Sequence, residues 1–213
     1  YYHGEGEIAL GRAMKQGART DFIIQSKLCS HAHEASEDEY RRRLHAQLGR
    51  LDTDYLDIEL MHNLHWSFYE KFGENFLRMA FKAKGEGILR HFGFSSHDTP
   101  QNVHRLIDLG VFECMLVQYN LVDPKWEECI QHAHERGLGV CVMGPVGGGR
   151  LGQAVPALQK ALPGSKRPMQ DIALRYVLSN KYVDVALSGM QNRRFLADNV
   201  RIANDPAPVL HED

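Results

Sequence analysis

Short apolar runs alternate with longer stretches of helical periodicity along almost the whole chain, and this alternation restricts the fold more than any other feature. Six runs are expected to be strands: residues 21–27, 55–62, 89–95, 113–120, 139–146 and 183–189. Helices are expected between and after them, at residues 36–52, 74–84, 99 onward, 123–137, 168–179 and 193–203, with a loop and helix at 1–17. Strict alternation of strand and helix predicts a parallel α/β sheet whose apolar strands are buried on both faces.

Local signals mark where two of these helices begin. Ser36 is followed three residues later by Glu39, which is the pattern of a capping box. Thr99 is followed by Pro100, a capping residue with proline at the first helical position. These signals place helix starts directly after two of the expected strands, as the alternation requires.

An open doubly wound sheet and a closed barrel both satisfy the alternation. The chain has no GxGxxG at its first strand-to-helix turn, and polar residues stand at the carboxyl end of nearly every strand. Both features favour a (β/α)8 TIM barrel, whose catalytic face is built from all its βα loops. With residues 1–17 as a loop and helix, the chain supplies strands 3 to 8 and helices 2 to 8. We therefore expect an incomplete, N-terminally truncated barrel, with residues 1–213 as a single domain.

Composition narrows the class of partner. The formal net charge is -2 and lysines and arginines are mixed with acids, so neither nucleic acid nor a membrane surface is an expected partner. The four cysteines have no CxxC spacing, which argues against a zinc ribbon, an iron–sulfur cluster or a disulfide scaffold. No apolar run is long enough to span a bilayer. A cytoplasmic protein that acts on a small molecule is expected.

The residues at the strand ends carry the chemistry. In chain order they are Lys27, His62, Ser95-Ser96-His97, Gln118-Tyr119-Asn120, Met143-Gly144-Pro145 and Ser188-Gly189, and Tyr2 precedes them all. Six stretches resemble the aldo-keto reductases, most closely the bacterial members with a Tyr-His-Gly motif: residues 2–7, Lys27 at its strand end, 60–62, 93–96, 118–120, and Gly189 with Asp198-Asn199. The resemblance extends over nearly the whole chain.

This resemblance implies an oxidoreductase that transfers a hydride between NAD(P)H and an aldehyde or ketone. Its catalytic residues would be Tyr2, Lys27 and His62. Carbonyl reduction needs a proton donor beside the oxygen, and a phenol with a pKa of about 10 donates reluctantly. A buried ammonium beside the phenol lowers its pKa, and a histidine on the neighbouring strand orients the carbonyl. The family's fourth member, an aspartate a few residues before the tyrosine, would precede Tyr1.

The same resemblance assigns the nicotinamide carboxamide to Ser95, Ser96 and Gln118. Ser96 stands where the family usually has asparagine, so its shorter side chain would reach the carboxamide through water. Met143 occupies a position where many relatives stack an aromatic ring on the nicotinamide, and a thioether can pack on a ring face.

Two further segments are expected to hold the rest of the cofactor. The glycines of residues 147–149 would let backbone amides approach a pyrophosphate, with Arg150 to neutralise it. The resemblance places adenine and its phosphate at the last strand and helix, and the expected cofactor is NADP, with NAD as the alternative. The candidate cofactor residues in these two segments are Gly147, Gly148, Arg150, Gly189, Arg193, Arg194, Asp198 and Asn199.

Two other functions are kept open. His31 and His33, together with His62 and His65, are similar to the zinc site of metal-dependent TIM-barrel hydrolases, although the later strand ends lack the remaining ligands. A non-catalytic nicotinamide-binding protein is the second alternative, because the catalytic aspartate is absent from this sequence. Trp66, Phe68 and Tyr69 are interpreted as a loop that either lines the substrate pocket or forms a minor buried cluster.

Overall fold

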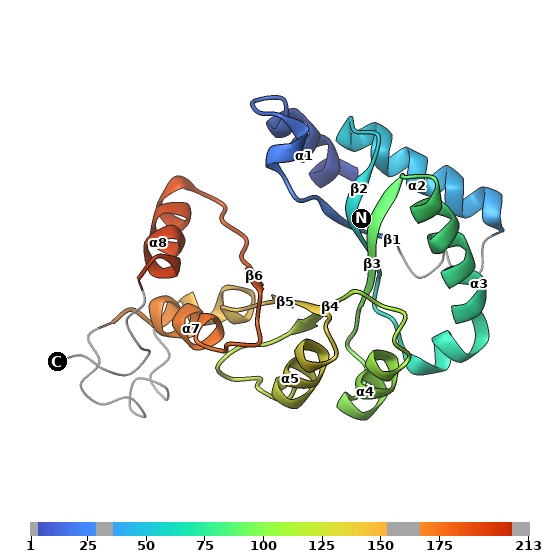
Figure 1. Cartoon of the computed structure of the whole chain (residues 1–213). Helices are drawn as coiled ribbons and strands as arrows, with labels where there is room; N and C mark the ends of the chain where they lie inside the picture. Colours follow the sequence, from blue (N-terminus) through green and yellow to red (C-terminus); the bar gives the residue numbers. More distant parts are fainter. Residues whose placement is uncertain (1–3, 29–35, 153–166, 206–213) are drawn as a thin grey trace. The chain divides into compact units, whose positions relative to one another are not determined.

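The computed structural model describes residues 4–28, 36–152 and 167–205 (Figure 1). The chain divides into two compact units, Tyr1–Met115 and Leu116–Asp213, and strand β4 (Cys114–Gln118) begins in the first and ends in the second. The expected single domain over residues 1–213 stays a prediction.

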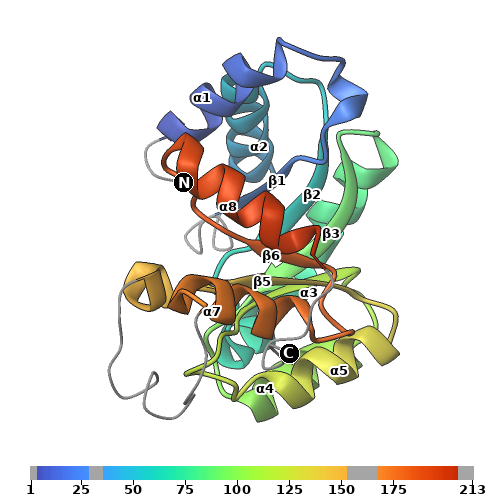
Figure 2. The same ribbon diagram turned by 90° about the vertical axis from the view of Figure 1, so that its left-hand side faces the viewer.

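The first unit contains three complete strands and the helices that follow them. In chain order its elements are α1 (Glu5–Met14), the 3-10 helix η2 (Arg19–Asp21), β1 (Gln25–Leu28), α2 (Glu37–Leu51), β2 (Leu56–Met61), α3 (Trp66–Gly85), β3 (Leu89–Ser95) and α4 (Pro100–Asp108). Helices α1 and α2 lie side by side in both views (Figures 1 and 2).

The second unit continues the pattern after β4. Its elements are α5 (Glu127–Glu135), β5 (Gly139–Met143), the 3-10 helix η4 (Gly147–Gly152), α7 (Met169–Leu178), β6 (Val185–Leu187) and α8 (Arg193–Ala203). Strand β5 pairs with β6 in parallel, with Cys141 opposite Val185. Among the described residues, no helix combines the length and apolar character that a transmembrane segment requires.

The strands are parallel and their order in the sheet follows their order in the chain. In the first unit, Lys27 of β1 is in register with Leu60 of β2, and Leu60 is in register with Gly93 of β3. The predicted parallel α/β alternation is therefore confirmed. Because the three strands run in the same direction, their carboxyl ends bring the residues that follow each strand to one edge.

The predicted helix starts are confirmed by their caps. Ser36 Oγ accepts a hydrogen bond from Glu39 N at 3.3 Å, and Thr99 Oγ1 accepts one from Asn102 N at 3.3 Å. The Glu39 carboxylate does not complete the capping box through its side chain. It accepts hydrogen bonds from the guanidinium groups of Arg42 and Arg43 instead.

Three predicted boundaries differ from the structure by three or four residues. Residues 19–21 form a 3-10 helix because the Asp21 carboxylate accepts the Ala18 N–H at 2.9 Å, so β1 begins only at Gln25. Strand β5 ends at Met143 because Gly144 adopts a left-handed conformation, with φ of 66°. Helix α5 begins at Glu127 rather than at residue 123, after a turn at the Pro124 segment.

The largest correction concerns Trp66, Phe68 and Tyr69, which were expected in a loop and lie in the first turns of α3. The helix starts there because the Asp98 carboxylate accepts the Trp66 N–H at 2.8 Å, a partner 32 residues away in sequence. The tertiary contact supplies the cap that the local sequence lacks.

Aromatic side chains fill the layer between sheet and helices in the first unit. Tyr40 and Phe76 meet edge to face at 5.4 Å between ring centroids, and Phe76 stacks on Phe92 at 5.4 Å. All three are fully buried. In the second unit, Leu151, Met169 and Ala173 form a small apolar cluster.

Candidate active site

Lys27 and His62 lie at the carboxyl ends of adjacent strands in the first unit. Lys27 is the third residue of β1, and His62 follows β2 directly, donating its backbone N–H to the Leu28 carbonyl at 3.1 Å. Both side chains are half-buried. The predicted pair is therefore placed on neighbouring strands at the same edge of the sheet.

Burial acts on both groups, and the charge of Lys27 acts on His62. Burial lowers the pKa of Lys27. Burial also lowers the pKa of His62, and the nearby charges of Lys27 and His97 lower that pKa further. His62 is therefore held neutral near neutral pH, as a hydrogen-bonding imidazole.

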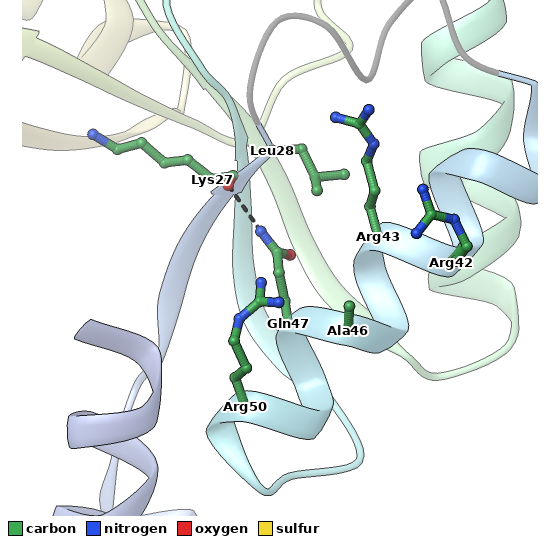
Figure 3. Close-up of a pocket in the computed structure, with 7 residues that line it drawn as sticks. All are labelled: Lys27, Leu28, Arg42, Arg43, Ala46, Gln47 and Arg50. Carbon is green, nitrogen blue, oxygen red and sulfur yellow. Dashed lines mark hydrogen bonds between the residues drawn. The ribbon is translucent and has the colours of Figure 1, made fainter. Parts of the chain in front are cut away.

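The side chain of Lys27 extends away from α2, as Figure 3 shows. Its backbone carbonyl accepts a hydrogen bond from Gln47 Nε2 at 2.8 Å. Helix α2 therefore fixes the main chain of β1 from one side, and the Lys27 side chain extends to the other.

A cavity of about 280 Å³ lies on the α2 side of β1 (Figure 3). Its lining residues are Lys27, Leu28, Arg42, Arg43, Ala46, Gln47 and Arg50. Glu39 pairs with two of these arginines and Glu7 with the third. Two carboxylates therefore share three guanidinium groups, so the charge of the arginines is only partly balanced.

Tyr2 lies outside the described residues. The description begins at Gly4, which has φ of 83° and stands at the N-cap of α1. The catalytic role of Tyr2 stays a prediction.

Ser95 and Ser96 are fully buried, with 1% and 0% of their surfaces exposed. Ser95 Oγ accepts the Asn63 N–H at 3.0 Å and donates to the Met61 carbonyl at 3.3 Å. Ser96 Oγ donates to the Leu64 carbonyl at 2.7 Å. Both hydroxyls tie the loop after β2 to the end of β3, so their assignment to the nicotinamide stays a prediction.

The candidate cofactor residues of the second unit are more accessible. Gln118 is half-buried and donates from Nε2 to Asp123 Oδ2 at 3.2 Å. Met143 is half-buried at the end of β5. An amide and a thioether therefore stand at the carboxyl ends of β4 and β5.

The glycine run after β5 presents an open backbone. The φ angles of Gly147, Gly148 and Gly149 are 59°, 66° and 91°. These values lie in the left-handed region, which glycine adopts more readily than other residues. A Cβ at Gly148 or Gly149 would meet no atom within 4 Å, and both glycines are exposed. Arg150 is exposed beside it. The N–H groups of Gly147 and Gly149 donate to the carbonyls of Gly144 and Val146 at 2.8 and 3.0 Å, so the assignment of this segment to the diphosphate stays a prediction.

The last strand and helix bring the remaining candidates together. Asn199 Nδ2 donates to Ser188 Oγ at 2.9 Å, which joins α8 to the end of β6. Arg194 Nε lies 3.8 Å from Asp198 Oδ2, and both Arg193 and Arg194 are exposed, as is Gly189. Two arginines at the start of an exposed helix fit a phosphate ligand.

Sequence reasoning gave no role to several residues that organise this site. The Asp98 carboxylate accepts hydrogen bonds from Trp66 N and Thr99 N, and so fixes the starts of two helices. Its position directly before a Thr-Pro helix start was the available signal. Glu7, Gln47 and Arg50 carried no local signal beyond their charge or polarity.

Within the described ranges, no three histidine, cysteine, aspartate or glutamate side chains are grouped so that they could hold a metal ion. His31 and His33, on which the metal-hydrolase alternative depends, lie outside those ranges.

The family of the chain follows from comparison with known proteins. The profile of the Aldo/keto reductase family matches residues 1–208, so the chain belongs to that family. It is 24% identical over 235 residues to the "Uncharacterized oxidoreductase YqkF" of Bacillus subtilis, with 96% of this chain and 75% of that protein covered. It is 26% identical over 225 residues to L-galactose dehydrogenase of Arabidopsis thaliana, covering 94% and 70% respectively.

Solved structures agree on the fold. The holo form of aldo-keto reductase AKR11C1 from Bacillus halodurans matches with a TM-score of 0.84 at 24% identity, covering 98% of this chain and 75% of that one. An aldo/keto reductase from Klebsiella pneumoniae in complex with NADP and acetate matches with a TM-score of 0.74 at 22% identity, covering 95% and 71%. The predicted fold class, an incomplete (β/α)8 barrel, is confirmed, and the family makes the chain an oxidoreductase.

Proposed function

We propose that this protein reduces an aldehyde or ketone with NAD(P)H as the hydride donor. The observation that carries the proposal is the pairing of Lys27 and His62 at the carboxyl ends of adjacent parallel strands, where the charge of one lowers the pKa of the other. Family membership supports the reaction class, because an ammonium and an imidazole at this position suit the stabilisation of a developing oxyanion.

The proposed mechanism uses three side chains around one oxygen atom. When bound, the nicotinamide supplies the hydride for the carbonyl carbon. The phenol of Tyr2 donates its proton to the carbonyl oxygen, which yields the alcohol, and solvent returns a proton to the phenolate. Lys27 favours the phenolate by its positive charge, and neutral His62 orients the carbonyl by a hydrogen bond.

The cofactor contacts are proposed for each unit by itself. Gln118 and Met143 would hold the nicotinamide ring, with Ser95 and Ser96 as further candidates for its carboxamide. The open glycine backbone at 147–149 and Arg150 would meet the diphosphate. Residues of the last helix would hold the adenosine end: Gly189, Arg193, Arg194, Asp198 and Asn199.

We propose NADP as the preferred cofactor, because Arg193 and Arg194 are exposed and suited to a 2′-phosphate. Relatives differ in this respect. A match of 24% identity is the "NADH-specific methylglyoxal reductase" of Escherichia coli, whereas the Klebsiella structure contains NADP. A small carbonyl compound is the proposed substrate, in line with the family.

Titration of the purified protein with NADPH and NADH, followed by nucleotide fluorescence, tests cofactor binding. Turnover with a panel of aldehydes and ketones then tests the reaction. We expect Tyr2→Phe to lose at least about 100-fold in kcat, because the phenolic proton is removed while the ring is kept.

Tyr1→Phe is the matched control, since it deletes the same hydroxyl one residue earlier. Retention of most of the turnover in Tyr2→Phe would remove Tyr2 as the acid. Cofactor binding without turnover on any carbonyl compound would instead favour the non-catalytic nicotinamide-binding alternative.

A further inference from the structure

His62 stands in a loop whose backbone is fixed by both neighbouring strands. Strand β2 lies between β1 and β3 in the sheet. The His62 N–H donates to the Leu28 carbonyl of β1 at 3.1 Å. The next N–H along the chain, that of Asn63, donates to Ser95 Oγ at the end of β3, at 3.0 Å. The peptide that carries His62 is therefore held between two strands.

The same loop makes further hydrogen bonds to the end of β3. Leu64 is 1% exposed, and its N–H donates to the Ser95 carbonyl at 2.7 Å. The Leu64 carbonyl accepts the Ser96 hydroxyl proton at 2.7 Å, and the Met61 carbonyl accepts that of Ser95 at 3.3 Å. Together with the Asn63 bond, these contacts join the loop to one strand end before and after the histidine.

Asn63 has the backbone conformation that this arrangement requires. Its φ is 52°, in the left-handed region that few residues other than glycine, asparagine and aspartate adopt. Its Oδ1 atom is buried and has no hydrogen-bond partner in the described part of the chain. A buried acceptor without a partner costs stability, so this oxygen does not explain how the loop is held. The contribution of Asn63 is the left-handed turn directly after His62.

We infer that Asn63 is a positioning residue: its left-handed backbone, locked to the end of β3, aims the His62 imidazole at the carbonyl group that is to be reduced. This inference rests on the proposed function. A change of φ at Asn63 rotates the chain before it against the chain after it, so the Asn63 and Leu64 N–H groups would no longer both reach Ser95. A strained conformation persists only where the surrounding structure holds it. Asn63 acts through His62 and has no contact with substrate in this scheme.

The test compares two substitutions that both remove the amide. Asn63→Gly keeps the left-handed turn at no steric cost, whereas the β-branched side chain of Asn63→Val opposes it. We expect kcat of Asn63→Gly to stay within about twofold of the parent. We expect kcat of Asn63→Val to fall roughly 10- to 100-fold, because displacements of about 1 Å at a reacting group have effects of this size.

A matched control exists at the opposite end of β2 from His62. Asp52, with φ of 53°, is the other described residue besides glycine that has a left-handed backbone. It is the C-cap of α2 and precedes β2. Asp52→Val introduces the same kind of strain, so we expect its melting midpoint to fall as in Asn63→Val, by roughly 5 °C, with kcat within about twofold of the parent. Each variant is assayed about 15 °C below the lowest melting midpoint of the set.

If Asn63→Val does not fold, Asn63→Ala takes its place, because alanine opposes a left-handed backbone less strongly. For this variant we expect kcat to fall about three- to tenfold. Equal kcat in Asn63→Gly and in the folded valine or alanine variant overturns the inference, because the backbone preference is then without effect. An equal loss of kcat in Asp52→Val overturns it as well, because strain away from His62 would then be sufficient.

A second readout does not depend on turnover. The imidazole of His62 titrates by NMR, and its signal is assigned from its loss in His62→Gln. In the parent, burial and the nearby charges of Lys27 and His97 lower the pKa of His62. We expect Asn63→Gly to keep this lowered pKa and Asn63→Val to move it toward the ordinary value of about 6.5. An unchanged titration in Asn63→Val overturns the inference.

The two readouts separate this inference from the proposed function. If the titration moves as expected but the parent reduces no carbonyl compound, the proposed function fails and the inference about the position of His62 is retained. If the parent is active and Asn63→Val changes neither kcat nor the titration, the inference fails and the proposed function is retained.

Discussion

The two units of the chain differ in how they present their functional residues. In the first unit, strand β2 is buried almost throughout, with Leu56 and Leu60 at 0% exposure. In the second, strand β6 is open, with Val185 at 45% and Leu187 at 40% exposure, and Ile202 is the buried residue of α8. The candidate catalytic residues Lys27 and His62 belong to the first unit.

This difference matches the demands of the two tasks. Proton transfer requires atoms held within a fraction of an ångström, and packed strands with internal hydrogen bonds provide that. Binding a long nucleotide requires an accessible surface with open backbone and exposed cations. The comparison predicts that substitutions in the first unit change rate and stability, and that those in the second change cofactor affinity.

The largest expected effect is at Lys27. Replacing it with methionine removes the charge that favours the phenolate in the proposed mechanism, and we expect kcat to fall on the order of 1000-fold. Turnover at saturating NADPH measures the loss, and the melting midpoint checks folding. Lys15→Met, at an exposed surface ion pair with Asp52, serves as the control. Equal activity in the two variants would separate Lys27 from the chemistry.

The next effect concerns Glu59, a fully buried carboxyl group on β2 that accepts a hydrogen bond from Tyr40 Oη at 2.8 Å. Burial raises its pKa from the ordinary 4.5 to about 7. The folded state therefore holds this proton more tightly than the unfolded chain does. The corresponding stability is fully present below pH 4.5 and is lost as pH rises through about 7.

We expect Glu59→Gln to remove this dependence and to stabilise the protein by about 3 kcal/mol at pH 9 relative to its effect at pH 4. Urea unfolding at a series of pH values measures it. A parallel pH dependence in the variant and the parent would show that Glu59 does not titrate in this range.

A smaller effect on the free energy of unfolding is expected from two glycine substitutions, one in tightly packed and one in open surroundings. A Cβ at Gly93 in β3 would lie 2.2 Å from the Cys114 carbonyl oxygen, so Gly93→Ala should cost about 2 kcal/mol or more. Gly148→Ala meets no neighbour within 4 Å and costs only its left-handed backbone strain, about 1 kcal/mol. Chemical unfolding of both variants gives the comparison. A larger loss at Gly148 would contradict the contrast between the units.

The smallest expected effect is at the arginines of α8. Replacing Arg193 and Arg194 with alanine should raise the KM for NADPH about tenfold and leave the KM for NADH unchanged. Steady-state kinetics with both nucleotides measures this, and Arg201→Ala on the same helix is the control. An equal change for both nucleotides would show that these arginines do not recognise a 2′-phosphate.

Much of the fold could be predicted because it depends on local chemistry. The helix at Glu37–Leu51 followed from the Ser36 cap, and α8 (Arg193–Ala203) from its periodicity. The start of α3 could not be predicted, because Trp66 is capped by Asp98 from the next βα loop. The extent of β1 was also overestimated, because the Asp21 carboxylate turns the chain before the strand begins.

The candidate site divides in the same way. The types and order of residues at the strand ends, Lys27 and His62 above all, were readable in the sequence because parallel strands bring their carboxyl ends to one edge. The hydrogen bonds that occupy Ser95 and Ser96 were not readable. A serine at a strand end looks the same in the sequence whether its hydroxyl binds a loop or a ligand.

The sequence by itself determined the parallel α/β alternation and the chemical groups of the site, because apolar periodicity and strand-end chemistry are local properties of the chain. Only the tertiary structure decided which groups are held in place and by what. Glu7 and Arg50 are 43 residues apart, and their 2.6 Å contact exists because α1 packs on α2. Burial and long-range pairing depend on the packed chain, and no segment carries them alone.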